Sequence, residues 1–263
     1  MRSAFLPCLV DTWLTPVNCH RATFFSKSIS TFVLIKTEVM STTKTKLIWA
    51  ENIAIQLFKA IEDRHLITAE KSERQLNAEV FELAFELFGI EKHWHKRIVR
   101  SGANTLLPYN ENPPDLVIQE DDILFFDFGP IVEDWEADLG RTYVIGNDPV
   151  KHKLKGDIEQ AWHETKEWFH KRSKLPASEL YHYAVEKAKD YGWVFGGELA
   201  GHLIGEFPHE RLEPGNYQLY VHPDNHNDMF LPDADGNKRE WVLEIHFVDK
   251  EKQVGGFFEQ LLT

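Results

Sequence analysis

Cysteine is almost absent from this chain of 263 residues. It contains only two, Cys8 and Cys19, and both lie within the first 20 residues. The rest of the sequence can therefore form neither a disulfide framework nor a cysteine-based structural zinc site. Any metal bound there must take oxygen and nitrogen ligands.

Long hydrophobic runs, glycosylation sequons and excess positive charge are also missing. No run of 18 apolar residues occurs, so we expect no transmembrane helix and no membrane partner. No Asn-X-Ser/Thr sequon indicates a glycosylated secreted protein. The formal net charge of −13 argues against a nucleic-acid partner. With 43% apolar and 13% aromatic residues, the chain can bury a core, as one large domain or two small ones.

Residues 1–39 differ from the rest, with more basic than acidic residues and several Ser and Thr. This composition is typical of a mitochondrial transit peptide, whereas the alternative is a misassigned start that precedes Met40. In both cases we expect 1–39 to be a poorly structured extension and 40–263 to be the folded domain. The expected location is cytoplasmic, or mitochondrial if 1–39 is a transit peptide.

Hydrophobic periodicity predicts helices first, then strands, then helices and strands again. A helical pattern begins at Lys46 with Trp49, Ile53, Leu57 and Ala60 on one face. Further helices are expected from an N-cap at Thr68 to Gly89, over 149–171 and over 177–191. Strands are expected at 97–100, 123–128, 143–145 after a Gly-Arg-Thr turn, 193–195, near His202, 241–248 and 256–261. Residues 210–240 are expected to form a long loop. The order predicts an α+β domain with a mainly antiparallel sheet and helices on one side, and it hints at an internal duplication.

Several ionisable residues in the last 140 positions of the chain stand in short apolar windows. They are Asp127, Asp138, His202, Glu244 and Glu259. A bare buried carboxylate is costly unless a cation or hydrogen bonds satisfy it. Four carboxylates and one imidazole can hold two divalent metals, and a pair of metals suggests hydrolysis.

Each residue taken alone has a simpler interpretation. Asp127 and Asp138 are 11 positions apart, so a turn would let them face each other across a hairpin, but both can also be ordinary edge aspartates. His202 can be a core histidine satisfied by a backbone carbonyl. Glu244 and Glu259 are the more informative pair, because buried glutamates are rare unless paired.

As a set, these windows resemble the pita-bread metallopeptidases, the family of methionine aminopeptidase, aminopeptidase P, prolidase and creatinase. The matching pieces are Asp127-Phe-Gly, Asp138-Leu-Gly-Arg-Thr-Tyr, Gly-His202-Leu-Ile-Gly with His209 seven residues later, Leu-Glu244-Ile and Gly-Gly-Phe-Phe-Glu259. The likeness covers roughly residues 45–263. It implies a curved antiparallel sheet with helices on the outer side, and a catalytic metallohydrolase domain at 40–263.

The resemblance also implies residue roles. Asp127 would bind one cation, His202 and Glu244 the other, and Asp138 and Glu259 would bridge the two. Glu244 would also move a proton, and His209 would bind substrate and donate a hydrogen bond to the tetrahedral intermediate. In the family a histidine that contacts the substrate precedes the first metal-binding aspartate, but in this sequence its position falls on Pro108 or Tyr109. Tyr109 can donate a hydrogen bond in its place and is the expected substrate contact.

We therefore expect a metal-dependent hydrolase of amide or peptide bonds, an aminopeptidase or Xaa-Pro peptidase, with two divalent cations (Mn, Co, Fe or Zn, manganese being one candidate). One alternative is a creatinase-like C–N hydrolase of a small metabolite, and another is a non-catalytic binding protein on the same fold. The expected partner is a small peptide or amide, and a homodimer is an open alternative to a monomer.

Overall fold

The computed structural model describes residues 42–210, 213 and 215–263. The predicted extension 1–39 lies outside the described residues, as does the boundary between it and the domain that follows. The elements in chain order are α2 (Thr43–Asp63), α3 (Glu73–Phe88), β1 (Ile98–Ser101), the 3₁₀ helix η1 (Gly102–Leu106), β2 (Ile123–Phe128), β3 (Ile131–Val132), β4 (Trp135–Glu136), β5 (Leu139–Val144), α4 (Pro149–His170), α5 (Ala177–Tyr191), β6 (Val194–Phe195), β7 (Gly201–Ile204), β8 (Glu240–Asp249) and β9 (Val254–Leu261).

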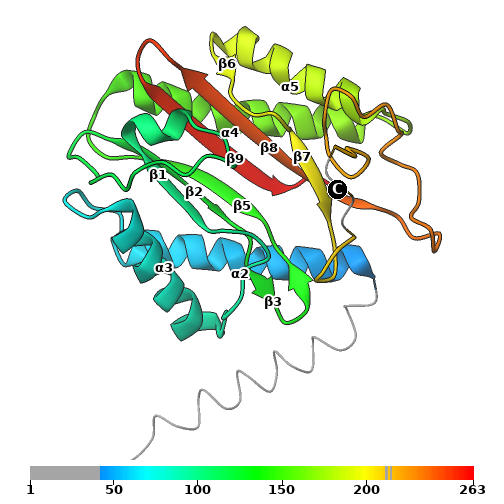
Figure 1. Cartoon of the computed structure of the whole chain (residues 1–263), viewed down its shortest axis with the longest axis horizontal. Coiled ribbons are helices and arrows are strands. Elements are labelled where there is room, and N and C mark those ends of the chain that lie inside the picture. The colour runs from blue at the N-terminus through cyan, green and yellow to red at the C-terminus, as the bar shows by residue number, and fades with distance from the viewer. Residues whose placement is uncertain (1–41, 211–212, 214) are drawn as a thin grey trace, which may run out of the picture. The chain divides into compact units, whose positions relative to one another are not determined.

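The main sheet has seven strands in the order β1-β2-β5-β9-β8-β6, and β7 also pairs with β8. All its pairings are antiparallel, and β3 and β4 form a separate small hairpin. Helices α4 and α5 run along the β8–β9 part of the sheet, whereas α2 and α3 run along the β1–β2–β5 part (Figure 1). The predicted α+β class with a mainly antiparallel sheet is thus confirmed.

The helices cover one face of this sheet. Along β2, Phe126 and Phe128 pack into a core shared with α2 and α3, while along β9 Phe258 packs into a second core shared with α4 and α5. Side chains alternate between the two faces of a strand, so the intervening residues point to the opposite face. That face, turned away from the helices, carries the ionisable side chains of interest.

Helix α3 shows why one predicted boundary was wrong. Its N-cap is Ser72 rather than Thr68: the Ser72 hydroxyl accepts from Gln75 N, and the Gln75 side chain accepts from Ser72 N. The residues before Ser72 are not helical, because 69–70 form a turn that is hydrogen-bonded to Ile118: Glu70 N donates to Ile118 O, and Ile118 N donates to Lys71 O. The predicted end at Gly89 is confirmed, because Gly89 caps the helix with a left-handed φ of 66°.

Two other details also differ from expectation. In α2 the predicted face is confirmed at Leu57, which is buried, whereas Trp49, Ile53 and Ala60 are only half-buried. The other buried positions of the helix are Leu47, Ala50, Ala54, Phe58 and Ile61. The segment Gly-Arg-Thr at 140–142 is no turn, because it belongs to β5 and pairs with β2 on one side and β9 on the other.

The predicted loop at 210–240 contains no helix or strand in its described residues before Glu240, where β8 begins. It nevertheless lies against the edge of β7: Leu203 N donates to Leu219 O, and Val221 N donates to Gly201 O. Among the described residues, none of the helices is long and apolar enough to cross a membrane.

Candidate metal centre

Three of the predicted ligands stand in one row across the sheet. Asp127 of β2 lies opposite Gly140 of β5, Gly140 lies opposite Glu259 of β9, and Glu259 lies opposite Glu244 of β8. A Cβ on Gly140 would come within 2.4 Å of Phe257 Cδ1 and 2.9 Å of Glu259 Cβ. The glycine therefore leaves space between carboxylates that come from strands on either side of it.

Asp138 and His202 meet Glu259 at the centre of this row. His202 Nε2 lies 3.2 Å from Asp138 Oδ2 and 3.6 Å from Glu259 Oε1. The Asp138 and Glu259 side chains are only 2–3% exposed. One ligand atom from each residue lies within 4.8 Å of the others, a spacing that suits a single shared cation.

A second group of three includes a residue that was not predicted. His95 joins Asp127 and Asp138, with its Nε2 3.1 Å from Asp138 Oδ1 and 3.5 Å from Asp127 Oδ1. Of the five predicted ligands, only Glu244 belongs to neither group, although it lines the same cavity opposite Glu259.

The relation between the two aspartates corrects the expected hairpin. Asp127 does not face Asp138 across the ladder; its partner is Gly140. The β3–β4 hairpin is inserted between β2 and β5, so Asp138 precedes β5 and reaches the centre from the strand's beginning. The two carboxylates still converge, because His95 Nε2 lies close to both.

The chemistry of the cluster fits divalent cations. Glu259 Oε2 is buried and has no hydrogen-bond partner among the described residues, an arrangement that costs free energy unless something else satisfies the oxygen. Burial raises the pKa of Asp127 to about 7. It also raises the pKa of Glu244, and it raises the pKa of Glu259 well above its usual range. Cations would satisfy these oxygens and offset the crowding of negative charge. Carboxylates and imidazoles together suit first-row divalent metals.

Asp138 behaves differently from its neighbours. Burial would raise its pKa as well, but the imidazoles of His95 and His202 outweigh burial and lower the pKa to about 2. Asp138 is therefore the carboxylate that stays ionised between two imidazoles.

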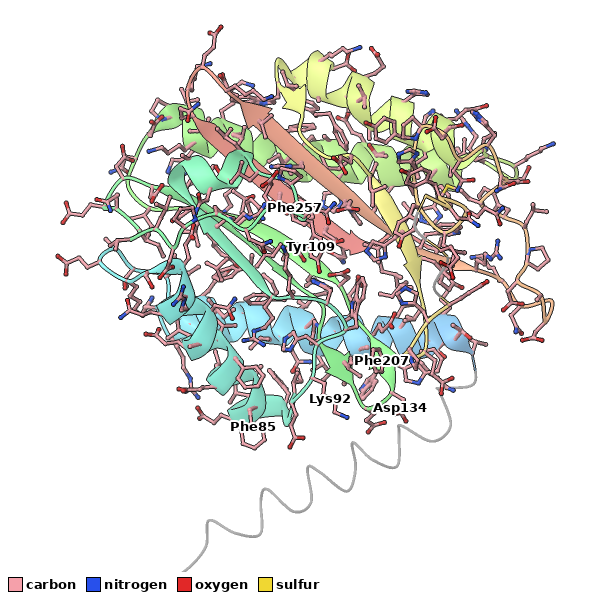
Figure 2. The ribbon with its side chains drawn as sticks, viewed as in Figure 1. Phe85, Lys92, Tyr109, Asp134, Phe207 and Phe257 are labelled. Carbon is pink, nitrogen blue, oxygen red and sulfur yellow. The ribbon has the colours of Figure 1, made fainter. Side chains whose placement is uncertain are left out.

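Above the cluster lies a cavity of about 770 Å³. Tyr109, 42% exposed, lines it, and Lys96 N donates to the Tyr109 hydroxyl over 3.3 Å. Figure 2 shows Tyr109 and Phe257, another lining residue, in the middle of the view, whereas Phe85 lies at its edge. The place of Tyr109 agrees with a substrate contact, and this role stays a prediction.

His209 also lines the cavity, and a buried carboxylate holds it in place. Its Nδ1 lies 2.6 Å from Glu136 Oε2, and Glu136 is 1% exposed. Glu136 also accepts from His209 N and Gly205 N, each over 3.3 Å. Because Glu136 occupies Nδ1, Nε2 is the nitrogen with which His209 can reach a substrate in the cavity.

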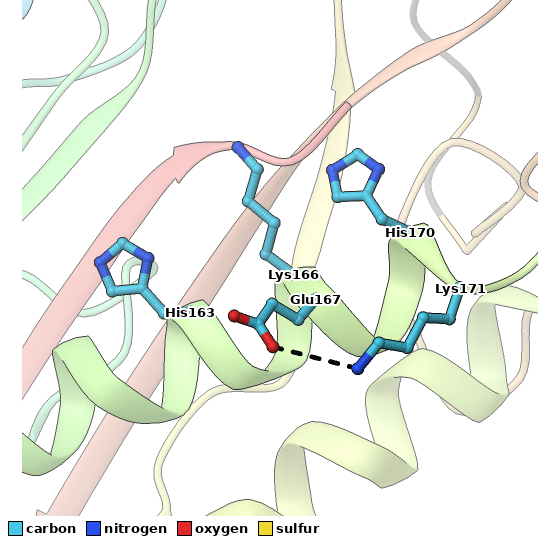
Figure 3. A pocket seen from close by; sticks show the side chains of 5 residues that line it. All are labelled: His163, Lys166, Glu167, His170 and Lys171. Atoms are coloured by element: carbon cyan, nitrogen blue, oxygen red, sulfur yellow. Dashed lines mark ion pairs between the residues drawn. The ribbon is translucent and has the colours of Figure 1, made fainter.

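A second hollow, of about 400 Å³, lies on the surface of α4 (Figure 3). It is lined by His163, Lys166, Glu167, His170 and Lys171. None of the predicted ligands contributes to it, and two lysine ammonium groups make it a poor place for a metal cation.

Gly129 packs directly against His95 and Trp94. A Cβ there would lie 2.3 Å from His95 Cδ2 and 2.4 Å from Trp94 Nε1. We expect Gly129→Ala to destabilise the fold by about 1–3 kcal/mol, because overpacking forces neighbours to shift. Gly156→Ala in α4 is the control: a Cβ there meets nothing within 4 Å, so this change should stabilise the helix by about 0.5–1 kcal/mol. Urea unfolding measures both, and equal effects would contradict the prediction.

The comparisons with known proteins agree with this geometry. The sequence model of metallopeptidase family M24 matches residues 46–233. The Xaa-Pro dipeptidase of Pyrococcus horikoshii is 30% identical over 194 residues, which cover 66% of this chain and 54% of that protein. The chain thus spans about half the length of this relative.

Solved structures share the fold. The X-Pro aminopeptidase of Thermotoga maritima superposes with a TM-score of 0.65 at 22% identity, covering 92% of this chain and 70% of that one. The methionine aminopeptidase of Rickettsia prowazekii superposes with a TM-score of 0.59 at 15% identity, covering 82% and 90%. The predicted pita-bread fold is confirmed, and the chain belongs to metallopeptidase family M24.

Proposed function

We propose that this chain is a peptidase with two divalent cations, which cleaves the peptide bond next to a free amino-terminal residue, with Xaa-Pro peptides as its substrate class. The observation that carries the proposal is the convergence of Asp127, Asp138, His202 and Glu259 on one cavity, with a buried Glu259 oxygen that lacks a partner among the described residues.

The chain's residues would divide the work as follows. Asp138 and Glu259 would hold both cations, Asp127 one of them, and His202 and Glu244 the other. Two divalent cations held there would activate a water molecule and polarise the scissile carbonyl. Glu244 would accept the water's proton and pass it on.

His209 would act on the substrate itself. Its Nε2 would donate a hydrogen bond to the oxyanion of the tetrahedral intermediate, while Glu136 stabilises the positive charge that the donating ring carries.

The cavity supports a small, partly apolar substrate. Its volume of about 770 Å³ falls within the ~300–1,000 Å³ range of small-ligand sites, which suits a di- or tripeptide. Tyr181, Leu219 and Pro223 line it together with the cluster and offer apolar surface for a pyrrolidine ring. The name of the P. horikoshii relative, Xaa-Pro dipeptidase, points to the same substrate class. The oxygen-rich ligand set favours manganese, with Co, Fe and Zn as alternatives.

A peptide-library digest paired with metal analysis tests the proposal. Protein loaded with Mn or Co should release the first residue from Xaa-Pro peptides faster than from matched Xaa-Ala peptides, and should hold two cations per chain. A preference for Met-Ala peptides would change the substrate class. If no peptide is cleaved while creatine is hydrolysed, the small-metabolite alternative is correct. The proposal fails if a broad library stays uncleaved by the two-metal protein.

Removing the metal should lower thermal stability. A ligand at 100 times its Kd stabilises the folded state by about 2.7 kcal/mol, and 1 kcal/mol corresponds to roughly 2–4 °C for a domain of this size. Chelation of one such cation should therefore lower the Tm by roughly 5–10 °C, as differential scanning calorimetry can measure. Asp138→Asn protein serves as the control, because chelation should leave its Tm unchanged. An unchanged Tm in the wild type would contradict a cation-filled site.

A further inference from the structure

His95 reaches the cluster from a segment between α3 and β1 that is fixed in place. Trp94 N donates to Gly129 O over 2.9 Å, and Ile131 N donates to Lys92 O over 3.0 Å. The Trp94 indole also donates to Ala137 O over 3.1 Å. These contacts tie the segment to both ends of the β3–β4 hairpin, and so hold the backbone beside His95 in place.

His95 and His202 are arranged in the same way on opposite sides of Asp138. His95 Nδ1 lies 2.7 Å from Lys96 O, and His202 Nδ1 lies 2.9 Å from Leu203 O. A carbonyl only accepts, so each Nδ1 carries the proton and donates it. Each Nε2 then faces Asp138, at 3.1 Å from Oδ1 for His95 and 3.2 Å from Oδ2 for His202.

This arrangement is the one that metal-binding histidines adopt. Such a histidine almost always donates its other ring N–H to a carbonyl, a carboxylate or water, which fixes the tautomer and directs the lone pair at the metal. His202 is a predicted ligand with this geometry, and His95 matches it in the side chain's burial as well, with 8% of its side chain exposed against 12%.

From this match we infer that His95 is a sixth metal ligand, which binds the same cation as Asp127 and Asp138. The inference rests on the proposed two-cation function. Charge favours it: two divalent cations already balance the four carboxylates Asp127, Asp138, Glu244 and Glu259, so the cluster needs a neutral imidazole rather than an imidazolium. With His95 included, each cation has one imidazole, whereas the predicted set left one cation with carboxylates alone.

Metal titration of variants tests this assignment without reference to activity. Wild-type protein, His95→Ala, His95→Gln and the control His163→Gln are each freed of metal and titrated with Co²⁺, with calorimetry and visible absorption as readouts. His163 is exposed on α4, where it lines the hollow shown in Figure 3, and it is not among the residues that line the cavity of the cluster. We expect both His95 variants to keep one tight cation and to bind the other at least about 100-fold more weakly. Removing a residue that only supports a metal ligand lowers metal affinity by up to about 100-fold, and losing a ligand itself should cost at least as much. Their Co²⁺ absorption should change, and that of His163→Gln should match the wild type.

The outcomes separate the inference from the proposed function. If the wild type binds no second cation, the proposed function itself fails, and the inference fails with it. If the wild type binds two and both His95 variants bind two with unchanged affinity, only the inference is overturned. Recovery of affinity in His95→Gln but not in His95→Ala would show that His95 merely donates a hydrogen bond to Asp138, and would also overturn it.

A measurement on the wild type covers the case in which the variants do not fold. In protein with ¹⁵N-labelled histidine, Zn²⁺ should shift the Nε2 resonances of two imidazoles to metal-bound values. A single shifted imidazole would leave His202 as the one histidine ligand and would refute the role of His95.

Discussion

Replacing Asp138 with Ala is expected to remove metal and activity together. Its two oxygens lie 3.1 Å from His95 Nε2 and 3.2 Å from His202 Nε2, so this carboxylate occupies the centre of the cluster. Under the proposed function Asp138 is shared by both cations, so its loss should lower kcat/KM by more than the ~10²–10³-fold typical of removing one oxyanion-hole donor. The checks are metal content per chain after dialysis against Mn²⁺, and the rate of Xaa-Pro cleavage.

Asp134→Ala is the matched control for this change. Asp134 is exposed at the tip of the β3–β4 hairpin, four positions before Asp138, and Figure 2 shows it on the lower side of the domain, away from Tyr109 and Phe257. This variant should keep two cations and full activity. Retention of both cations by Asp138→Ala would contradict the bridging role, whatever happens to the rate.

Among the proposed ligands, those easiest to recognise in the sequence are the ones that interrupt an apolar strand. Asp127, Glu244 and Glu259 interrupt apolar runs, and an apolar run with one charge in it signals a buried charge from local composition alone. The paired strands then place these residues in one row, because β2, β5, β9 and β8 are neighbours in the sheet. Strand β2 and helix α5 were predicted with their observed bounds because their signals are local as well: a short apolar run in β2 and a helical repeat in α5.

The residues that the sequence hid are those placed by long-range pairing. His95 stands in the polar segment Lys92-His-Trp-His-Lys96, and only its pairing with the turn after β2 brings it to the cluster. Glu136 belongs to a two-residue strand, too short for a periodic signal. The sequence held one weak signal for both His95 and Glu136, since each directly follows a tryptophan. A tryptophan next to an ionisable residue is equally compatible with a surface position, so this signal does not identify a buried site.

Replacing His209 with Ala is expected to lower kcat by about 10²–10³-fold with metal content unchanged, because an oxyanion-hole donor acts in the transition state rather than in metal or ground-state binding. KM for an Xaa-Pro peptide should change little. Steady-state kinetics with metal analysis of the same samples measures both. Loss of a cation in His209→Ala would make His209 a ligand instead, and an unchanged kcat would remove it from the mechanism.

Glu136 extends this prediction to the residue that holds His209. Glu136→Gln keeps an acceptor for His209 Nδ1, which lies 2.6 Å from Oε2 in the native pair, but removes the buried negative charge. We expect a ~10–100-fold loss of kcat, the usual range for a partner that orients an active-site group. If Glu136 acts only through His209, a protein with both substitutions should be no slower than His209→Ala, since the effects of substituting residues that act as one unit do not add. Additive losses would instead show that Glu136 supports catalysis by a second route, through its hydrogen bonds to the backbone at Gly205 and His209.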